Sequence, residues 1–446
     1  MTIGGPSPHP REEPRDDRYD EGMIPDPAPT PPPDAHGSSS IDPVGSSGGD
    51  GTTETSGRSP GDGCQRSPLD AWHRSPLDAW HRSHGATMVP FGGYQMPLHY
   101  GSILEEHHAC RSAAALFDVS HMGRLRFEGE GAAELLDHLC TRRISDMPVG
   151  RSRYGLICNA DGGVLDDVLV SHLETPSGKR LHLMVVNASN RAKLLRWIEP
   201  HLRDFPRVTM TDRTIGTAMF AVQGPAAVEA AARLFSFDVS RLSRYASIVG
   251  SQFNKPVIVS RTGYTGEDGL EVIVRDDHAT RVWENLLLVG REAGFRAAGL
   301  AARDTLRMEA GMPLYGHELT EAIDPHTAGL SFAVTEGHRH IGDDALAAVR
   351  DRGVRRRRIG LVVEGRRPVR EGAKVFPAGR DESAVAIGAV TSGGPSPTAG
   401  HPIAMAYVDA KVAGDSIAEG ERYEVDIRGS RTAARRVPLP FYRRGR

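Results

Sequence analysis

Residues 154–170 read YGLICNADGGVLDDVLV, and residues 183–187 read LMVVN. The short apolar run 154–158 predicts a strand, and the turn residues that follow it include two glycines, which can adopt positive φ. The β-branched run 164–170 predicts a second strand, and 181–187 predicts a third. Two adjacent acids, Asp166 and Asp167, therefore lie inside a predicted strand.

Neighbouring side chains of a strand point to opposite faces, so the two acids are expected to lie in different surroundings. One of them can face solvent while the other faces the interior or a pocket. A charge inside an apolar strand is costly unless it is paired or used in chemistry. The residues alone leave a second interpretation open, in which both acids are solvated near the turn.

Length and composition indicate an ordinary globular protein. The 446 residues are enough for two or three domains, and 39% apolar with 25% charged residues is typical of such proteins. The net charge of −3 hides an asymmetry, because residues 1–65 hold four arginines and twelve acids and so carry −8. The mildly basic remainder suits an anionic ligand or an acidic partner.

Four scattered cysteines, with no C-x-x-C pair, predict a reducing compartment without a disulfide framework. The sequence contains no run of eighteen apolar residues, so it predicts no membrane span. Its N-terminus lacks the basic and apolar regions of a secretory signal. We therefore expect a cytoplasmic protein that does not contact the membrane.

The chain divides into four parts by composition. Residues 1–65 are rich in Pro, Gly, Ser and Asp and are expected to be disordered. Residues 66–81 are an octapeptide, RSPLDAWH, written twice, and the second copy leads into the fold. We interpret the first copy and the tail as dispensable. Residues 82–342 form the main body, and residues 343–446 a β-module that is predicted to be a small barrel.

The main body mixes helices and strands without a regular βαβ alternation, which predicts an α+β fold. Helical spacing is found at 102–110, 131–140, 190–198, 225–235 and 280–292. Strands are expected at 124–127, 217–222, 257–260 and 270–274. The arginine run 355–358 lacks aromatic neighbours, so we interpret it as a solvated linker and expect no nucleic-acid binding.

GGVLDD followed by VVN resembles the aminomethyltransferase, or T-protein, family of the glycine cleavage system. Further motifs agree in the same order, from about residue 75 to the end of the chain, and together they are specific. They are MVPFGGYQMPLHYGSILEEHHACR (88–111), FDVSHMG (117–123), SRTGYTGEDGLEV (260–272), GLAARDTLRMEAGMPLYGHEL (299–319), IDPHTAGLSF (323–332), VTSGGPSPTAGHPIAMAYV (390–408) and PFYRR (440–444).

The resemblance implies three domains arranged as a cloverleaf around a folate, with the main body made of two subdomains and a C-terminal β-barrel. It implies transfer of an aminomethyl group from the lipoyl arm of a separate H protein to tetrahydrofolate, which is a co-substrate. The products are 5,10-methylenetetrahydrofolate and ammonia. We expect the protein to be a monomer that binds the lipoylated H protein transiently.

The resemblance also assigns the site. Asp167, the second acid of the pair, keeps the family's spacing of thirteen residues from Tyr154 and is the expected catalytic residue, while Asp166 is expected to point away. A carboxylate near the pterin can orient the nucleophile and handle a proton. The expected folate-binding residues are Met122, Tyr154, Asn187, Tyr264, Glu271, Arg303 and Arg443.

Other functions fit the sequence less well. Histidine and cysteine spacings match no metal site, and neither a Walker loop nor a complete dinucleotide fingerprint is present. The folate-binding proteins that assist iron–sulfur assembly carry a K-G-C-x-x-G-Q-E type motif, which is absent where RTGYTGEDGLE stands. A related tetrahydrofolate-dependent demethylase is the alternative that the sequence separates least well.

Overall fold

The three strands predicted around the acid pair form one side of a five-stranded sheet. The sheet has the order β6-β7-β8-β5-β9, and the acids lie on β7, between β6 and β8. Its strands are β5 (Gly123–Glu128), β6 (Ser152–Cys158), β7 (Val164–Glu174), β8 (Arg180–Val186) and β9 (Thr209–Asp212). The antiparallel register places Leu156 opposite Asp167 and Ile157 opposite Asp166.

Strand β7 is buried on both of its faces. On one face Val168 packs with Leu135 of α3 and Leu194 of α4, and on the other Leu169 packs with Tyr154. Helices α3 (Ala132–Leu139) and α4 (Arg191–Ile198) thus cover the first face. The expectation that one acid of the pair can face solvent is wrong, because neither face of this strand is solvated.

A second sheet of six strands has the order β11-β12-β13-β10-β4-β14. Its strands are β4 (Ala115–Asp118), β10 (Thr217–Gln223), β11 (Ser247–Gln252), β12 (Lys255–Ser260), β13 (Gly269–Arg275) and β14 (Arg296–Ala298). Helices α5 (Ala227–Ala232) and α6 (Ala279–Val289) contribute Ala230 and Trp283 to the core that covers it. The predicted helices and strands of the main body are confirmed, with shifted ends.

The second copy of the octapeptide belongs to the folded body, before the boundary expected at residue 82. It ends in α1 (Asp78–Ser83), and Leu77, Trp80 and His81 are buried. His81 Nε2 lies 2.8 Å from Asp118 Oδ2, and the Trp80 and Trp283 rings meet edge to face at 5.3 Å. Beside it, β1 (His73–Arg74), β3 (Tyr94–His99) and β2 (Thr87–Phe91) form a small sheet.

The predicted C-terminal barrel is confirmed as a closed barrel of the order β15-β18-β17-β16-β19-β20. Its strands are β15 (Arg356–Val363), β16 (Lys374–Pro377), β17 (Gly388–Ser396), β18 (His401–Asp409), β19 (Arg422–Ile427) and β20 (Ser430–Val437). Helix α9 (Ala410–Ala413) contributes Ala413 to the barrel core, whereas α8 (Asp343–Arg352) contributes Leu346 to a core cluster of the main body. The linker interpretation of the arginine run is wrong for residues 356–358, because they begin β15.

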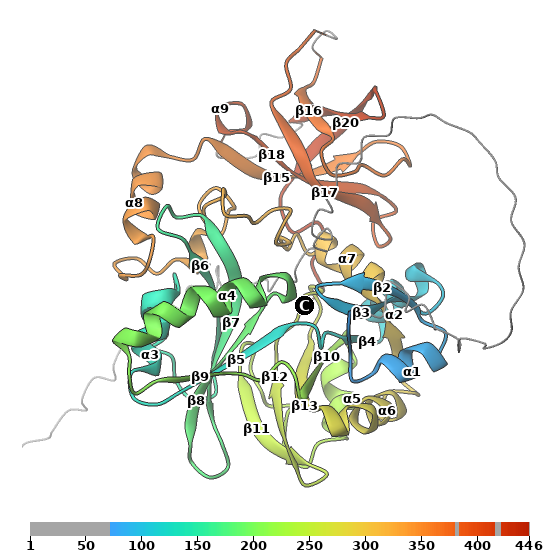
Figure 1. Cartoon of the computed structure of the whole chain (residues 1–446). Coiled ribbons are helices and arrows are strands. Elements are labelled where there is room, and N and C mark those ends of the chain that lie inside the picture. The colour runs from blue at the N-terminus through green and yellow to red at the C-terminus, as the bar shows by residue number, and fades with distance from the viewer. Residues whose placement is uncertain (1–71, 380–382, 415–420, 446) are drawn as a thin grey trace, which may run out of the picture.

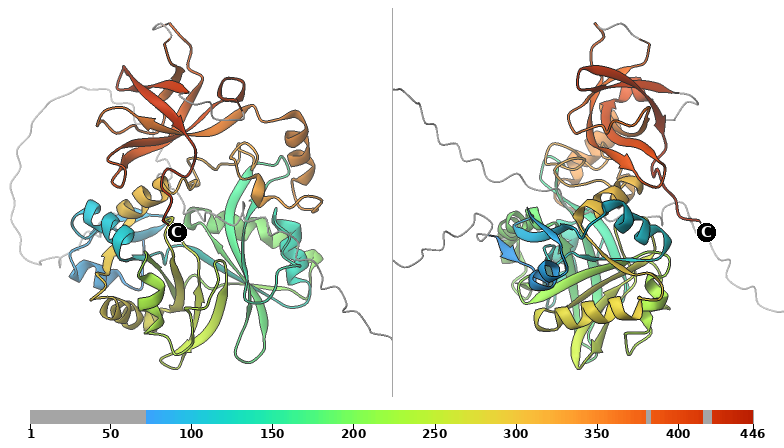
Figure 2. Two further views of the ribbon diagram at one scale, coloured as in Figure 1. Left: turned by 180° about the vertical axis from the view of Figure 1, so that it is seen from behind. Right: turned by 90° about the vertical axis from the view of Figure 1, so that its right-hand side faces the viewer.

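Figure 1 shows the barrel above the two larger sheets, with α7 (Leu300–Glu309) between them. The view from the side in Figure 2 confirms that the barrel stands on the main body. Near α7 lies α2 (Ile103–Ser112), whose N-cap Ser102 accepts a hydrogen bond from the Glu105 amide. Short 3₁₀ helices span Ala188–Asn190, Glu199–Asp204, Asp276–His278 and Ser331–Ala333.

This computed structural model describes residues 72–379, 383–414 and 421–445. Residues 1–65, which are expected to be disordered, and most of the first octapeptide lie outside these ranges. Across the described part of the chain, no helix combines the length and the apolar character that crossing a bilayer requires.

Candidate active site

Asn187 joins the two acids of β7. Its side-chain Nδ2 donates to Asp166 Oδ1 at 2.7 Å and to Asp167 Oδ1 at 2.6 Å, and its backbone N–H donates to Asp166 Oδ2 at 3.1 Å. This geometry follows from the sheet, because Asn187 directly follows β8, the strand that pairs with β7. All three residues are buried. Asp166 is therefore a hydrogen-bonded partner of the site, although it lies on the opposite face from Asp167.

Burial strongly disfavours the charged form of this acid pair. Burial raises the pKa of Asp166 to about 7, against the lowering effect of the amide donors of Asn190 and Asn187. The pKa of Asp167 is raised well above its usual range, first by burial and then by the charge of Asp166. Asp166 receives more amide donors than Asp167, and burial favours the protonated form of both carboxyl groups.

Two further residues of the predicted site lie around Asp167. The Tyr154 hydroxyl donates to Asp167 Oδ2 at 3.3 Å. Met122 is buried in the same apolar cluster as Tyr154 and Leu169. It directly precedes β5, whose first residue pairs with β8 next to Asn187. The structure thus joins Tyr154, Asp167 and Asn187 by hydrogen bonds, and Met122 belongs to the same apolar cluster as Tyr154.

A cavity of about 690 Å³ lies between α7, the small N-terminal sheet and the barrel strand β17. Two predicted residues line it, Tyr264 and Arg303, and the Arg303 guanidinium lies 5.1 Å from the Tyr264 ring centre. Burial raises the pKa of Tyr264 well above its usual range, and the charge of Asp167 contributes to this shift. Asp167 does not line the cavity, but it lies within electrostatic reach of a residue that does.

The remaining two predicted residues occupy different positions. Glu271 is buried on β13 and accepts a hydrogen bond from Thr262 Oγ1 at 2.5 Å. Its pKa is raised by burial. Arg443 is exposed on the C-terminal segment, which returns to the main body through a bond from the Tyr442 amide to the Glu309 carbonyl. No described contact joins Glu271 or Arg443 to the acid pair.

Two further residues contact the acid pair or its strand and are not among those predicted from the sequence. Asn190 donates to Asp166 Oδ1 at 2.6 Å, because the 3₁₀ turn Ala188–Asn190 brings it back toward β7. The signal was available as a second asparagine three residues after Asn187. Tyr315 donates to the Val164 carbonyl at 3.3 Å and thereby ties the segment after α7 to the start of β7. No pattern in the sequence marks this long-range contact.

The architecture defines a class of protein: a two-sheet body with a buried acid pair, joined to a closed six-stranded barrel. Two family models match this division. The model described as the GCVT N-terminal domain matches residues 77–337. The glycine cleavage T-protein C-terminal barrel domain matches residues 356–443.

Individual relatives agree over most of their length. The aminomethyltransferase of Streptomyces avermitilis is 45% identical over 368 residues, covering 81% of this chain and 95% of the relative. That of Moorella thermoacetica is 44% identical with the same coverage. The crystal structure of aminomethyltransferase T from Bartonella henselae superposes with a TM-score of 0.75 at 31% identity, covering 83% of this chain and 98% of that one. The chain belongs to the glycine cleavage T-protein family of aminomethyltransferases.

Proposed function

We propose that this protein takes the aminomethyl group from the lipoyl arm of the glycine cleavage H protein and passes its one-carbon unit to tetrahydrofolate. The products are 5,10-methylenetetrahydrofolate and ammonia. Membership of the aminomethyltransferase family supports the reaction class. The observation that carries the site assignment is the buried pair Asp166–Asp167 with its shared donor Asn187. Such a pair keeps a proton available near neutral pH.

The residues present suit a folate. A cavity of about 690 Å³ is within the usual range for a ligand of this size. Asn187 Oδ1 is buried and has no hydrogen-bond partner among the described residues, so it can accept from a ligand N–H. The buried carboxylate of Glu271 can accept two parallel donors from an amino-pyrimidinone edge. The cationic Arg303 in the cavity wall suits the anionic end of the same ligand.

Tetrahydrofolate supplies the nitrogen that takes the one-carbon unit. In the proposed mechanism Asp167 handles the accompanying proton at Oδ2, the oxygen that also faces the Tyr154 hydroxyl. Asn187 holds Asp167 Oδ1, so the carboxyl group keeps one orientation while its charge changes. Burial keeps the pKa of Asp167 high, and the charge of Asp166 raises it further. The catalytic role of Asp167 and the binding roles of its neighbours are parts of this proposal.

The partner is proposed to be the lipoylated H protein, bound transiently by a monomer in the cytoplasm. Exposed arginines at the cavity and beside it suit an acidic carrier. Arg370 lines the cavity and is exposed, and Arg366 and Arg367 are exposed in the same segment. The oligomeric state and the cellular location stay predictions from the sequence.

The test is an assay of purified protein with aminomethylated H protein, with and without tetrahydrofolate. We expect folate-stimulated release of ammonia. Asp167→Asn should reduce the rate by at least about a hundredfold, as for loss of a general acid–base group. Asp161→Asn, in the exposed turn before the same strand, is the matched control and should retain full activity. Folate binding without turnover in the wild type would contradict the transferase assignment and favour a demethylase or a binding protein.

A further inference from the structure

Glu309 is a buried acid in an unfavourable place. It is the last residue of α7, the helix that also carries Arg303, and its side chain has no solvent exposure. The C-terminal end of a helix carries partial negative charge, so a carboxylate there needs strong compensation. The compensation comes from a cluster of side chains outside the proposed catalytic site, His107, Arg111, Ser396 and Thr398, which we call the Glu309 cluster.

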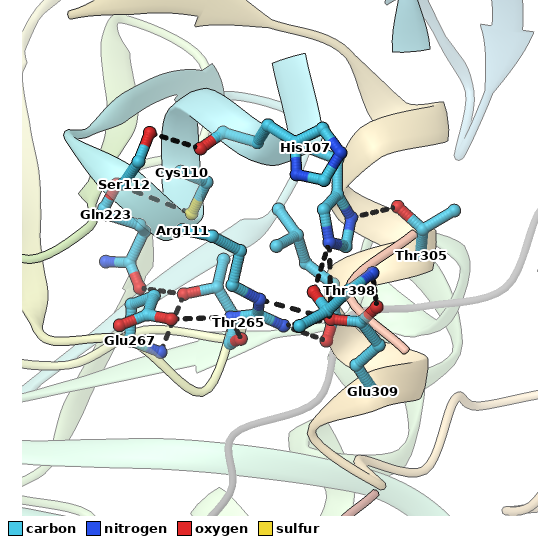
Figure 3. Close-up of polar contacts among 12 residues, drawn as sticks. His107, Cys110, Arg111, Ser112, Gln223, Thr265, Glu267, Thr305, Glu309 and Thr398 are labelled. Carbon is cyan, nitrogen blue, oxygen red and sulfur yellow. Dashed lines mark hydrogen bonds and ion pairs between the residues drawn. The ribbon is translucent and has the colours of Figure 1, made fainter. Parts of the chain in front are cut away.

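The barrel supplies one half of the Glu309 cluster. The turn between β17 and β18 sends three donors to the carboxylate: Ser396 Oγ at 2.6 Å, the Thr398 amide at 2.9 Å and Thr398 Oγ1 at 2.7 Å. Figure 3 shows Thr398 beside the Glu309 carboxylate, with His107 approaching the same group from α2. A single carboxylate thus fixes a turn of the barrel to a helix of the main body.

Arg111 supplies the other half. Its Nε and Nη2 donate to Glu309 Oε2 at 3.1 and 2.8 Å. Its Nη1 donates to the Thr265 carbonyl at 2.8 Å and to Glu267 Oε1 at 2.9 Å. Figure 3 shows Arg111 extending between Glu309 and the segment that holds Thr265 and Glu267. The loop after Tyr264 is therefore tied, through Arg111, to the same carboxylate as the barrel turn.

Both segments continue directly into walls of the cavity. Gly393, Gly394 and Pro395 precede Ser396 and line the cavity on the barrel side. Tyr264 precedes Thr265 and lines it on the side of the main body. We propose that Glu309 is a positioning residue for the folate site, because its carboxylate sets the separation between the barrel wall and the Tyr264 wall. This inference rests on the proposed function for the identity of the ligand.

Other side chains of the main body hold the start of β17, and the Glu309 cluster holds its end. Glu318, also buried, accepts from Thr391 Oγ1, and Arg307 Nη2 donates to Ser392 Oγ at 3.0 Å. These contacts fix the start of the wall, at residues 391 and 392. The Glu309 cluster fixes its end, at residues 396 and 398. Loss of Glu309 should therefore free the end of the wall while the barrel remains seated.

The experiment compares Glu309→Gln and Thr398→Val with the wild type in the full-length protein. Glu309→Gln keeps the shape but removes the charge that holds Arg111, and Thr398→Val removes one donor from the barrel side without removing a charge. Glu105→Gln, which breaks an exposed ion pair of α2 with Arg296, is the matched control. Two quantities are measured: the KM for tetrahydrofolate with kcat, and amide hydrogen exchange of segments 264–268 and 393–400 without ligand.

We expect Glu309→Gln to raise the KM for tetrahydrofolate about tenfold, with kcat at saturation changed less than about twofold. Thr398→Val should raise KM about threefold, and Glu105→Gln should change neither. Both segments should exchange faster in Glu309→Gln while β6–β8 keep their protection. Equal protection of the two segments in Glu309→Gln and wild type would overturn the inference, and so would a fall in kcat with KM unchanged. A wild type that does not use tetrahydrofolate refutes the proposed function instead, and the exchange data still decide the role of Glu309.

Discussion

The acid pair makes a prediction about how stability depends on pH. Burial raises the pKa of Asp166 to about 7 in the folded protein, whereas an unfolded chain releases this proton near pH ~4. Between these values the folded state binds more protons than the unfolded state. The free energy of unfolding therefore falls as the pH rises through this window, and the fall that this group causes is complete above pH ~7. Asp166→Asn removes this group and should remove its share of the decline, while Asp167, whose pKa burial also raises, keeps its own share.

The size of the effect follows from the shift. A difference of roughly three pKa units at about 1.4 kcal/mol each corresponds to about 4 kcal/mol between pH 4 and pH 8. The assay is urea unfolding of wild type, Asp166→Asn and the exposed control Asp161→Asn at several pH values. The quantity compared is the slope of the free energy of unfolding against pH. The absolute stability is not compared, because the amide introduced by Asp166→Asn makes different hydrogen bonds with Asn187 and Asn190.

A second readout uses the same variant. Without the charge of Asp166, Asp167 loses the repulsion that helps to raise its pKa, so it should ionise at lower pH. The basic limb of the pH–rate profile should then move to lower pH in Asp166→Asn. Identical pH dependence of stability in Asp166→Asn and wild type would refute the argument that this carboxyl group is protonated by burial. A control that loses the decline as well would show that other groups cause it.

Three further substitutions test the rest of the site. Tyr154→Phe removes the 3.3 Å hydrogen bond to Asp167 and should lower kcat about fivefold, equivalent to about 1 kcal/mol, in steady-state assays; an unchanged kcat would remove Tyr154 from the mechanism. Asn187→Leu removes the donor shared by two buried carboxyl groups and should cost about 3 kcal/mol in urea unfolding, and a cost below about 1 kcal/mol would show that water replaces it. Arg303→Met removes the cation from the cavity wall, so the stabilisation by added tetrahydrofolate, measured as a rise in Tm, should disappear. Retained stabilisation by the ligand would place its binding elsewhere.

Much of the fold could be predicted from local patterns. The turn after residue 158 and the β-branched run that follows predict β6 and β7, since glycine conformations and β-branched packing are local properties. The barrel was predictable for the same reason, as short strands separated by turn residues. The ends of the helices were not, because α5 stops at Ala232 and the expected helix extends to residue 235.

The surroundings of the acids could not be predicted from alternation alone. Period-two spacing separates Asp166 from Asp167, but it does not say whether helices cover the second face of the sheet. That cover comes from α3 and α4, which are distant in sequence from β7. The contacts of Glu309 are long-range in the same way, since Arg111 and Thr398 lie far from it on either side. A single sequence carries no signal for such pairings.

The buried octapeptide has a consequence for how this end of the gene can vary. The helix sequence DAWHRS occurs at 70–75 and again at 78–83, and the second copy forms α1, whose Trp80 packs against Trp283. If the first copy took the place of the second, the same leucine, tryptophan and histidine would pack beside Trp283. The eight extra residues would then lengthen the following loop, which costs little entropy. Either copy of the octapeptide can therefore supply the same buried side chains. A mutation in one copy can be compensated by the other copy. Repeat slippage can likewise add or remove eight residues here without exposing the core.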